Sequence, residues 1–225
     1  MNYLVVGASS GIGAEVAKRL KNQGHQVFTA QRRSVDGFFH LLFDATHPNL
    51  DFSALPEELH GVVYSPGTIL LKPFHRFSVE DFQHDFQVNV LGAVHVLQGC
   101  LPKLKKANGA NVVLFSSVAA QMGMGFHASI AAAKSAVEGL TRSLAAEWAP
   151  ANIKVNVIAP SLTNTPLASA LLSTPEKMEA SAKRHAIGRV GEPSDVAQAV
   201  EFLLNPQLWT TGIILPVDGG MGNTK

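Results

Sequence analysis

The amino-acid sequence predicts an α/β fold in which a single doubly wound parallel sheet is flanked by helices on both faces. Its 225 residues suit one domain with one well-buried core. Short apolar runs alternate with longer helical patterns along the chain, as expected when helices connect parallel strands. Several of these runs are apolar without polar alternation, which is typical of strands that are covered on both sides.

The predicted elements follow one another in a regular order. Apolar runs predict strands at Asn2–Val6, Gln26–Ala30, Leu41–Phe43, Gly61–Tyr64, Asn111–Phe115, Lys154–Ile158 and Ile213–Val217. Helical periodicity predicts connections at Ile12–Asn22, Val79–Val88 continuing to Lys105, Ile130–Trp148 and Ser194–Leu204. Ser78 and Asp81 form a capping box that fixes one of these helix starts.

The least regular segment runs from 162 to 188 and is rich in Ser, Thr, Ala and Leu. Thr174 followed by Pro175 predicts the start of a short helix within it. Because the segment follows the carboxyl end of a predicted strand, we interpret it as a small substrate lid. A pair of ordinary surface helices fits the same pattern equally well.

The composition argues against several classes of protein. The chain has 18 Lys and Arg against 17 Asp and Glu, so we expect no nucleic acid and no membrane among its partners. No apolar run approaches the ~20 residues of a membrane span, and no signal peptide precedes the first strand. The single cysteine, Cys100, excludes an intramolecular disulfide, and the histidines show no metal-ligand spacing. We therefore expect a cytoplasmic protein without a metal site.

A glycine-rich turn joins the first predicted strand to the first helix. Gly7 permits a tight turn, Gly11 lets the backbone approach a diphosphate, and Gly13 allows close packing of the helix. The remaining residues of the turn are Ser9, Ser10 and Ile12. The helix start presents free N–H groups and a positive dipole end to phosphates. This placement indicates one Rossmann-type nucleotide-binding domain over residues 1–225.

The Gly-x-x-x-Gly-x-Gly spacing resembles that of the short-chain dehydrogenase/reductase family, and the resemblance covers essentially the whole chain. It implies a nicotinamide dinucleotide cofactor that is contacted by residues matching Asp44, Gly67, Pro160 and Thr165. Val217-Asp218-Gly219-Gly220 resembles the C-terminal signature of the family. Two motifs depart from the pattern. Only Gly67 remains of an Asn-Asn-Ala-Gly motif, and Ser161 replaces the glycine of Asn-x-x-x-Pro-Gly.

The end of the second predicted strand bears on the choice of cofactor. An NAD-binding protein carries an acidic residue there to bind the ribose 2′-hydroxyl. This chain has Gln31-Arg32-Arg33 instead, and a guanidinium can hold a 2′-phosphate through paired hydrogen bonds. The sequence therefore favours NADP(H), although the nearby Asp36 keeps NAD(H) possible.

The resemblance also implies a proton-relay site. In the family, a tyrosine four residues before a lysine gives a proton to the substrate oxygen, a serine binds that oxygen, and an asparagine completes the relay. Ser117, Lys134 and Asn89 match the last three roles, and Lys134 is also expected to bind the nicotinamide ribose. The tyrosine position holds Ile130. The tyrosines of this chain lie elsewhere in the sequence, at Tyr3 and Tyr64.

His127 is the nearest ionisable candidate for the missing proton donor. It lies seven positions before Lys134, about 10 Å along a helix axis, so the two side chains can converge on one substrate atom without touching. An imidazole with an ordinary pKa near 6.5 is a competent acid at neutral pH. The alternative is that His127 is a surface or capping residue.

These observations predict an NADP(H)-dependent oxidoreductase that reduces a carbonyl or an activated alkene on a small-molecule or acyl substrate, with an atypical proton donor. A catalytically silent nucleotide-binding sensor is the first alternative, because the tyrosine is missing. The second is a structural subunit of the same fold. By resemblance, we expect a homodimer or homotetramer formed through the helices at Val88–Lys105 and Ile130–Trp148.

Overall fold

The computed structural model describes residues 1–222 and 224, and it confirms the predicted fold class. Within these residues, all strands are parallel and form one sheet in the order β3-β2-β1-β4-β5-β6-β7. The bounds of the strands are β1 Asn2–Val6, β2 Gln26–Gln31, β3 Phe39–Leu42, β4 Gly61–Tyr64, β5 Asn111–Phe115, β6 Lys154–Pro160 and β7 Ile214–Val217. Each lies within two residues of its predicted position.

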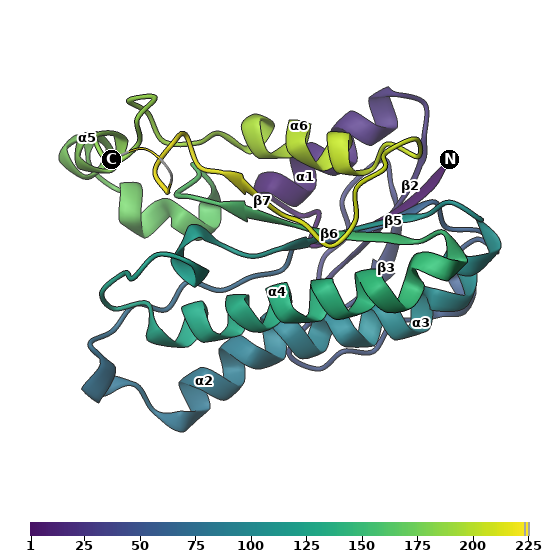
Figure 1. Ribbon diagram of the computed structural model, residues 1–225, viewed down its shortest axis with the longest axis horizontal. Helices are drawn as coiled ribbons and strands as arrows, with labels where there is room; N and C mark the ends of the chain where they lie inside the picture. Colours follow the sequence, from purple (N-terminus) through teal and green to yellow (C-terminus); the bar gives the residue numbers. More distant parts are fainter. Residues whose placement is uncertain (223, 225) are drawn as a thin grey trace.

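Helices cover both faces of this sheet (Figure 1). The first layer holds α1 (Gly11–Asn22) and α6 (Pro193–Leu203), which contact each other. The opposite layer holds α2 (Val79–Phe86), α3 (Gly92–Lys106) and α4 (Ala128–Trp148).

Each central strand contributes to two hydrophobic clusters, one on each face. Leu4 and Val6 of β1 join the cluster that contains buried residues of α3 and α4. Tyr3 and Val5 of the same strand join the cluster that contains buried residues of α1 and α6. Since alternate side chains of a strand point to opposite faces, burial on both sides explains the apolar runs without alternation.

The long helix predicted from Val79 is interrupted. Its capping box is present, because the Ser78 side chain accepts from the Asp81 N–H while the Asp81 carboxylate accepts from the Ser78 N–H. A π-helical segment, Gln87–Leu91, then separates α2 from α3 and contains Asn89. Such segments are rare and are frequent at functional sites.

Helix α4 begins at Ala128, two residues before the predicted start at Ile130. His127 is its N-cap residue. Ala128 and Ser129 are small residues without a strong apolar pattern, so periodicity did not detect them, yet Ser129 is buried. The N-terminal turn of α4 therefore lies closer to His127 than predicted.

The segment from 162 to 188 forms a 3-10 run, Pro166–Leu172, and a short helix, α5 (Pro175–Ala182). The Thr174 side chain accepts a hydrogen bond from the Lys177 N–H, as the sequence predicts for an N-cap. Figure 1 shows α5 at one end of the molecule. Its action as a lid remains a prediction.

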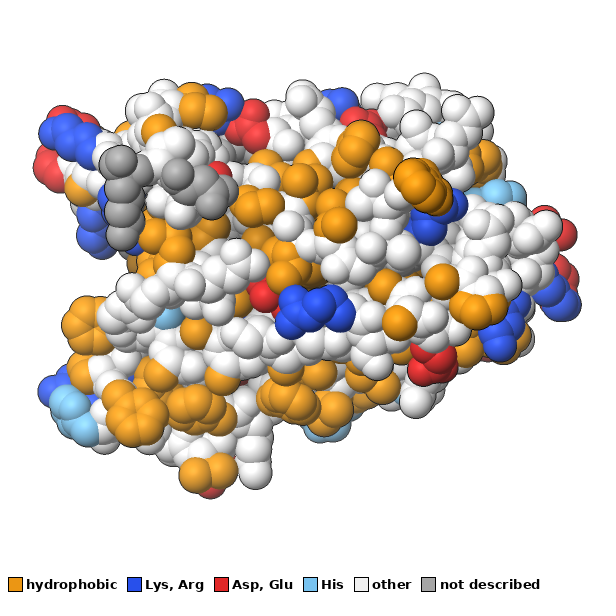
Figure 2. Space-filling model, viewed as in Figure 1, with side chains coloured by type: hydrophobic (Ala, Val, Ile, Leu, Met, Phe, Trp, Pro, Cys, Tyr) orange, Lys and Arg blue, Asp and Glu red, His pale blue; other side chains and the backbone are white. Residues whose placement is uncertain are grey.

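Charges are dispersed over the face of the molecule in Figure 2, with Lys, Arg, Asp and Glu side chains mixed rather than gathered by sign. Cys100 is buried in α3, and burial raises the pKa of its thiol to about 12. Across residues 1–222 and 224, no helix is both long and apolar enough to span a membrane.

Candidate functional site

The site forms at the topological switch point of the sheet. Strands β1 and β4 are neighbours, and their carboxyl ends lead into the loops that contain Gly7 and Gly67. Open α/β sheets bind ligands at this kind of crevice. A groove of about 930 Å³, called the nucleotide groove below, lies here. Its lining includes most of the residues predicted to bind the cofactor, namely Gly7, Ser9, Ser10, Gly11, Ile12, Gly13, Arg32, Arg33, Asp44, Gly67 and Thr165.

Close backbone contacts at the glycine turn exclude any larger residue. A Cβ on Gly13 would lie 2.5 Å from the Gly7 carbonyl oxygen and 2.4 Å from Ser65 Oγ. Gly7 has φ +85° and Gly11 has φ +58°, a region that favours glycine. The first N–H groups of α1 have no intrahelical acceptor, and the cap residue Ser10 gives them no side-chain hydrogen bond. The turn therefore fits a diphosphate as the sequence predicts.

Arg32 and Arg33 follow β2 and line the nucleotide groove, where both side chains are exposed. Asp44 lines the groove near them, and two hydrogen bonds from Thr46 to its Oδ1 lower the pKa of its carboxyl. Asp36, which kept NAD(H) possible, is exposed and is not part of the groove lining. The groove thus presents guanidinium groups at the position that determines cofactor choice.

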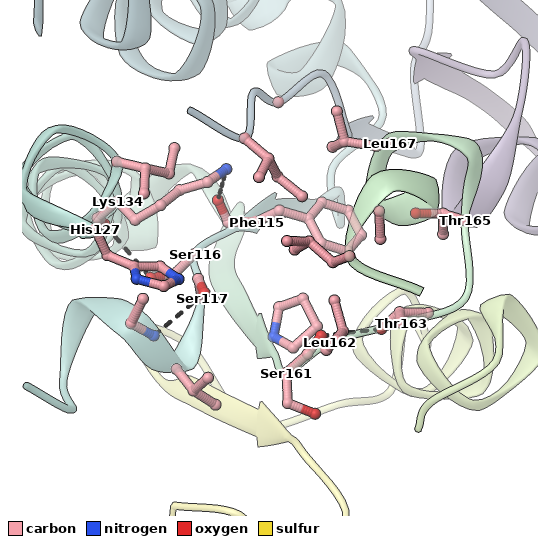
Figure 3. A pocket seen from close by; sticks show the side chains of 18 of the residues that line it. Phe115, Ser116, Ser117, His127, Lys134, Ser161, Leu162, Thr163, Thr165 and Leu167 are labelled. Atoms are coloured by element: carbon pink, nitrogen blue, oxygen red, sulfur yellow. Dashed lines mark hydrogen bonds between the residues drawn. The ribbon is translucent and has the colours of Figure 1, made fainter. Parts of the chain in front are cut away.

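A second hollow, the substrate cavity, opens from the same loops and has a volume of about 310 Å³. Ile12, Gly67 and Thr165 line both spaces, so the groove and the cavity are continuous. The predicted residues on the cavity wall are Ser117, His127, Lys134 and Pro160, together with Ile130. Figure 3 shows Lys134, His127 and Ser117 gathered at one side of this space and Thr163, Thr165 and Leu167 at the other.

Lys134 is 7% exposed, and its Nζ donates a hydrogen bond to the Phe115 carbonyl oxygen at 2.9 Å. Burial lowers the pKa of the Lys134 ammonium to about 8, while the charge of Asp85 raises it. Ile130 lies one helical turn earlier and lines the cavity, so a sec-butyl group occupies the place where the family resemblance implies a phenol.

Ser117 and His127 lie on the same side of the cavity as this lysine in Figure 3. The Ser117 Oγ accepts from the Ala119 N–H at 3.2 Å, so its own hydrogen can turn toward a ligand. The His127 Nδ1 lies 2.6 Å from the Gly125 carbonyl oxygen. Because a carbonyl only accepts, Nδ1 must carry a proton, which leaves Nε2 for the cavity.

Asn89 does not line the cavity, and its part in the proton relay stays a prediction. Its Nδ2 donates to Thr68 Oγ1 at 3.0 Å and to the Asp85 carbonyl at 2.8 Å. The side chain is 2% exposed and lies on a π-helical turn, where the sequence predicted one continuous helix, and its Oδ1 would be 3.5 Å from a Cβ on Gly67. Asn89 can therefore act on Lys134 but does not reach a substrate directly.

Neither tyrosine replaces the missing phenol. The Tyr64 hydroxyl donates to the Val88 carbonyl at 2.6 Å, and burial raises its pKa. The Tyr3 hydroxyl contacts Met1 Sδ. Neither residue is on the cavity wall.

Two polar pairs at the site were not predicted from the sequence. Asp85 is fully buried and accepts a hydrogen bond from Thr68 Oγ1 at 2.5 Å. The sequence signal that could have pointed to Asp85 is its position four residues before Asn89 on a predicted helix. Ser161 and His185 are hydrogen-bonded at the wall of the cavity. No local pattern pointed to His185, because it lies in the irregular segment.

Comparison with known proteins identifies the family. A family model described as enoyl-(acyl carrier protein) reductase matches residues 52–222. A tropinone reductase homologue of Arabidopsis thaliana is 34% identical over 98% of this chain and 92% of the relative. The chain belongs to the short-chain dehydrogenase/reductase family. It is an oxidoreductase of that family, related also to the 3-oxoacyl-[acyl-carrier-protein] reductase MabA of Mycobacterium tuberculosis, with 32% identity over 98% and 92% of the two chains.

Solved structures of this family share the fold closely. The aldohexose dehydrogenase of Thermoplasma acidophilum matches with a TM-score of 0.90 and 26% identity, over 98% of this chain and 93% of that one. A 2-deoxy-d-gluconate 3-dehydrogenase candidate from Agrobacterium tumefaciens, solved with bound NADP, matches with a TM-score of 0.89 and 30% identity over 98% and 95% of the two chains.

Proposed function

We propose that this short-chain dehydrogenase/reductase uses NADP(H) to reduce a carbonyl group or an activated alkene by hydride transfer, with a proton donor other than tyrosine. The observation that carries the proposal is the continuity of a groove lined by Arg32 and Arg33 with a cavity lined by Ser117, His127 and Lys134. When bound, the nicotinamide would supply the hydride. The chain itself must hold the substrate oxygen and provide a proton.

We assign the binding of the substrate oxygen and the supply of the proton to Ser117, Lys134 and His127. The Ser117 hydroxyl donates to the substrate oxygen, while the Lys134 ammonium supplies positive charge near the developing oxyanion and binds the nicotinamide ribose. The protonated ring of His127 donates through Nε2, since Nδ1 is engaged with Gly125. Asn89 fixes the surroundings of Lys134 from behind Gly67.

The preference for NADP(H) rests on the sequence at the end of β2, where Gln31 is followed by Arg32 and Arg33 rather than by an acidic residue. Arg32 and Arg33 are exposed in the groove, and no salt bridge occupies them among the described residues. The bound NADP of the Agrobacterium tumefaciens relative is consistent with this choice. A small carbonyl compound or an acyl thioester suits the cavity, and the relationship to MabA favours the acyl alternative.

The proposal is tested by titrating the protein with NADPH and NADH and then following nicotinamide oxidation over a panel of ketones, 3-oxoacyl thioesters and enoyl thioesters. We expect tight NADPH binding and turnover of at least one compound, with turnover lost in Lys134→Ala. Tight binding without any turnover would instead favour the silent sensor. Assembly as a homodimer or homotetramer and a cytoplasmic setting stay predictions, the first to be checked by size-exclusion chromatography with light scattering.

A further inference from the structure

A serine–histidine pair forms part of the wall of the substrate cavity. Ser161 follows directly after β6, and His185 lies just beyond α5. The Ser161 Oγ and the His185 Nε2 are 2.8 Å apart, and the His185 Nδ1 is 2.9 Å from the Ser181 carbonyl oxygen. His185 is 4% exposed, and all three residues line the cavity. As viewed in Figure 3, Ser117 lies between Lys134 and Ser161, so the pair stands apart from the proton-donor side.

These contacts define the direction of the hydrogen bond. The Ser181 carbonyl can only accept, so Nδ1 of His185 carries the proton. In a neutral ring, Nε2 then has a lone pair and accepts from the Ser161 hydroxyl. The Ser161 hydroxyl donates its hydrogen bond to His185, so its oxygen lone pairs remain free to accept another. The side chain therefore faces the cavity as an acceptor of hydrogen bonds.

Contacts other than this pair also hold the segment from 162 to 188 in place. The backbone of this segment is fixed by hydrogen bonds from the Asn164 N–H to the Gly191 carbonyl and from the Ile187 N–H to the Gly219 carbonyl. The motif that Ser161 resembles has glycine at this position, which brings no side chain. The serine hydroxyl is thus an addition to the cavity wall rather than a part that the fold needs.

The surroundings of this acceptor are mostly apolar. Leu162, Leu171 and Met221 line the same cavity. A ligand that covers the Ser161 oxygen loses free energy if it leaves the remaining lone pairs unmatched, so the cavity favours a ligand that satisfies them. A hydrogen-bond donor on the ligand, such as a hydroxyl, satisfies a serine oxygen that acts as an acceptor.

We propose that Ser161, oriented by His185, selects substrates that carry a hydroxyl group in addition to the reacting carbonyl. The inference rests on the proposed function, since it names the substrate class of the same cavity. Ser161 touches the substrate as a specificity-determining residue. His185 is a positioning residue that acts through Ser161.

Binding without turnover provides the first test. Cyclohexanol and the 1,2-, 1,3- and 1,4-cyclohexanediols are titrated against the NADPH-loaded protein, which has no means of oxidising an alcohol, and affinities are measured by ligand-observed NMR. We expect at least one diol to bind roughly tenfold more tightly than cyclohexanol, as for one matched hydrogen bond. Ser161→Ala and Ser161→Gly should remove this preference, and His185→Gln should reduce it. Thermal unfolding confirms that each variant is folded.

Thr174→Ala is the matched control, because it removes the N-cap of α5 without touching the pair. It should leave the preference for the diol unchanged. If Thr174→Ala and Ser161→Ala reduce the preference equally, the pair only latches the lid and the inference is overturned. Equal affinity of the wild type for cyclohexanol and every diol, or no measurable binding of any of them, overturns it as well.

Turnover separates this inference from the proposed function. NADPH oxidation is followed with cyclohexanone and with its 3- and 4-hydroxy derivatives. Ser161→Ala should raise KM for the hydroxylated ketone about tenfold relative to KM for cyclohexanone, with little change in kcat for the hydroxylated ketone. If no ketone is reduced but the diol preference persists and depends on Ser161, the reaction is wrong and the inference stands. If ketones are reduced without any preference for a hydroxyl, the proposed function stands and the inference about Ser161 is overturned.

Discussion

Lys134 and Asn89 both approach Gly67 from the side to which a Cβ would point, since that Cβ would be 3.7 Å from the lysine Nζ and 3.5 Å from the asparagine Oδ1. Asn89 is in turn bonded to the Asp85 backbone and, through Thr68, to the Asp85 carboxylate. A buried ammonium, amide and carboxylate thus belong to one cluster behind the cavity. The carboxylate offsets part of the cost of burying the lysine charge.

Asp85→Asn should shift the pH dependence of cofactor binding. The Asp85 charge raises the pKa of Lys134 against the effect of burial, so its removal should let the ammonium lose its proton at lower pH. We expect NADPH affinity of the wild type to weaken as pH rises through about 8, and the midpoint of Asp85→Asn to lie below that of the wild type. Fluorescence titrations of NADPH between pH 6 and 10 measure this.

Glu138→Gln is the control for that shift. Glu138 is also a buried carboxylate on the helix that carries Lys134, but it accepts hydrogen bonds from Ser116 and Gln121 and is not among the charges that act on the lysine. It should leave the midpoint where it is in the wild type. An identical midpoint in all three proteins would mean that Asp85 does not support the Lys134 charge.

Lys134→Met should change how stability depends on pH. The pKa of Lys134 falls from 10.5 to about 8 on folding, so between these pH values the unfolded chain binds more protons than the folded one. Stability of the wild type therefore rises with pH across this window, by up to about 3 kcal/mol relative to the methionine variant. Urea unfolding of both proteins at intervals from pH 7.5 to 10.5 gives the difference. A difference that is flat with pH contradicts the prediction.

Arg32→Ala should weaken NADPH binding much more than NADH binding. Loss of a charge-assisted hydrogen bond to the 2′-phosphate corresponds to a factor of roughly ten to a hundred in NADPH affinity. Asp36→Asn serves as the control and should affect neither cofactor, because Asp36 does not line the groove. Equal weakening of both cofactors by Arg32→Ala would rule out a role of this arginine in phosphate binding. Calorimetric titration with each nucleotide provides the measurement.

The part of the fold that local rules control was predictable from the sequence. The strands were identified because both faces are buried, as the two clusters sharing β1 demonstrate. The glycine turn was identified because close approach and positive φ restrict Gly7 and Gly13 to glycine. The start of α4 was placed two residues late, since small side chains such as Ala128 carry little periodicity.

Local sequence rules did not predict the tertiary contacts of the site. The π-helical turn that contains Asn89 interrupts the predicted helix without leaving a mark on the apolar pattern. The contact between Ser161 and His185 joins segments 24 positions apart, one of them irregular. Contacts of this kind depend on how the residues after α5 meet the residues after β6, which periodicity does not encode.

Ile130→Tyr should restore a phenol next to Lys134. Ile130 lines the cavity one helical turn before the lysine, so a tyrosine there would place its hydroxyl near the ammonium. The nearby positive charge lowers the pKa of a phenol and makes it a better acid. We expect kcat for carbonyl reduction to rise in this variant, provided that thermal unfolding shows that the larger side chain is accommodated.

Combining Ile130→Tyr with His127→Ala tests the proton donor itself. His127→Ala should lower kcat of the wild-type background about a hundredfold, the usual contribution of a general acid. The same change should cost far less in the Ile130→Tyr background, because the phenol then supplies the proton, and the double-mutant cycle measures that coupling. His75→Ala, in an exposed turn outside the cavity, should have no effect in either background. Full activity of His127→Ala with Ile130 in place would remove His127 from the mechanism. Equal losses of kcat in the two backgrounds would mean that His127 acts independently of the missing phenol.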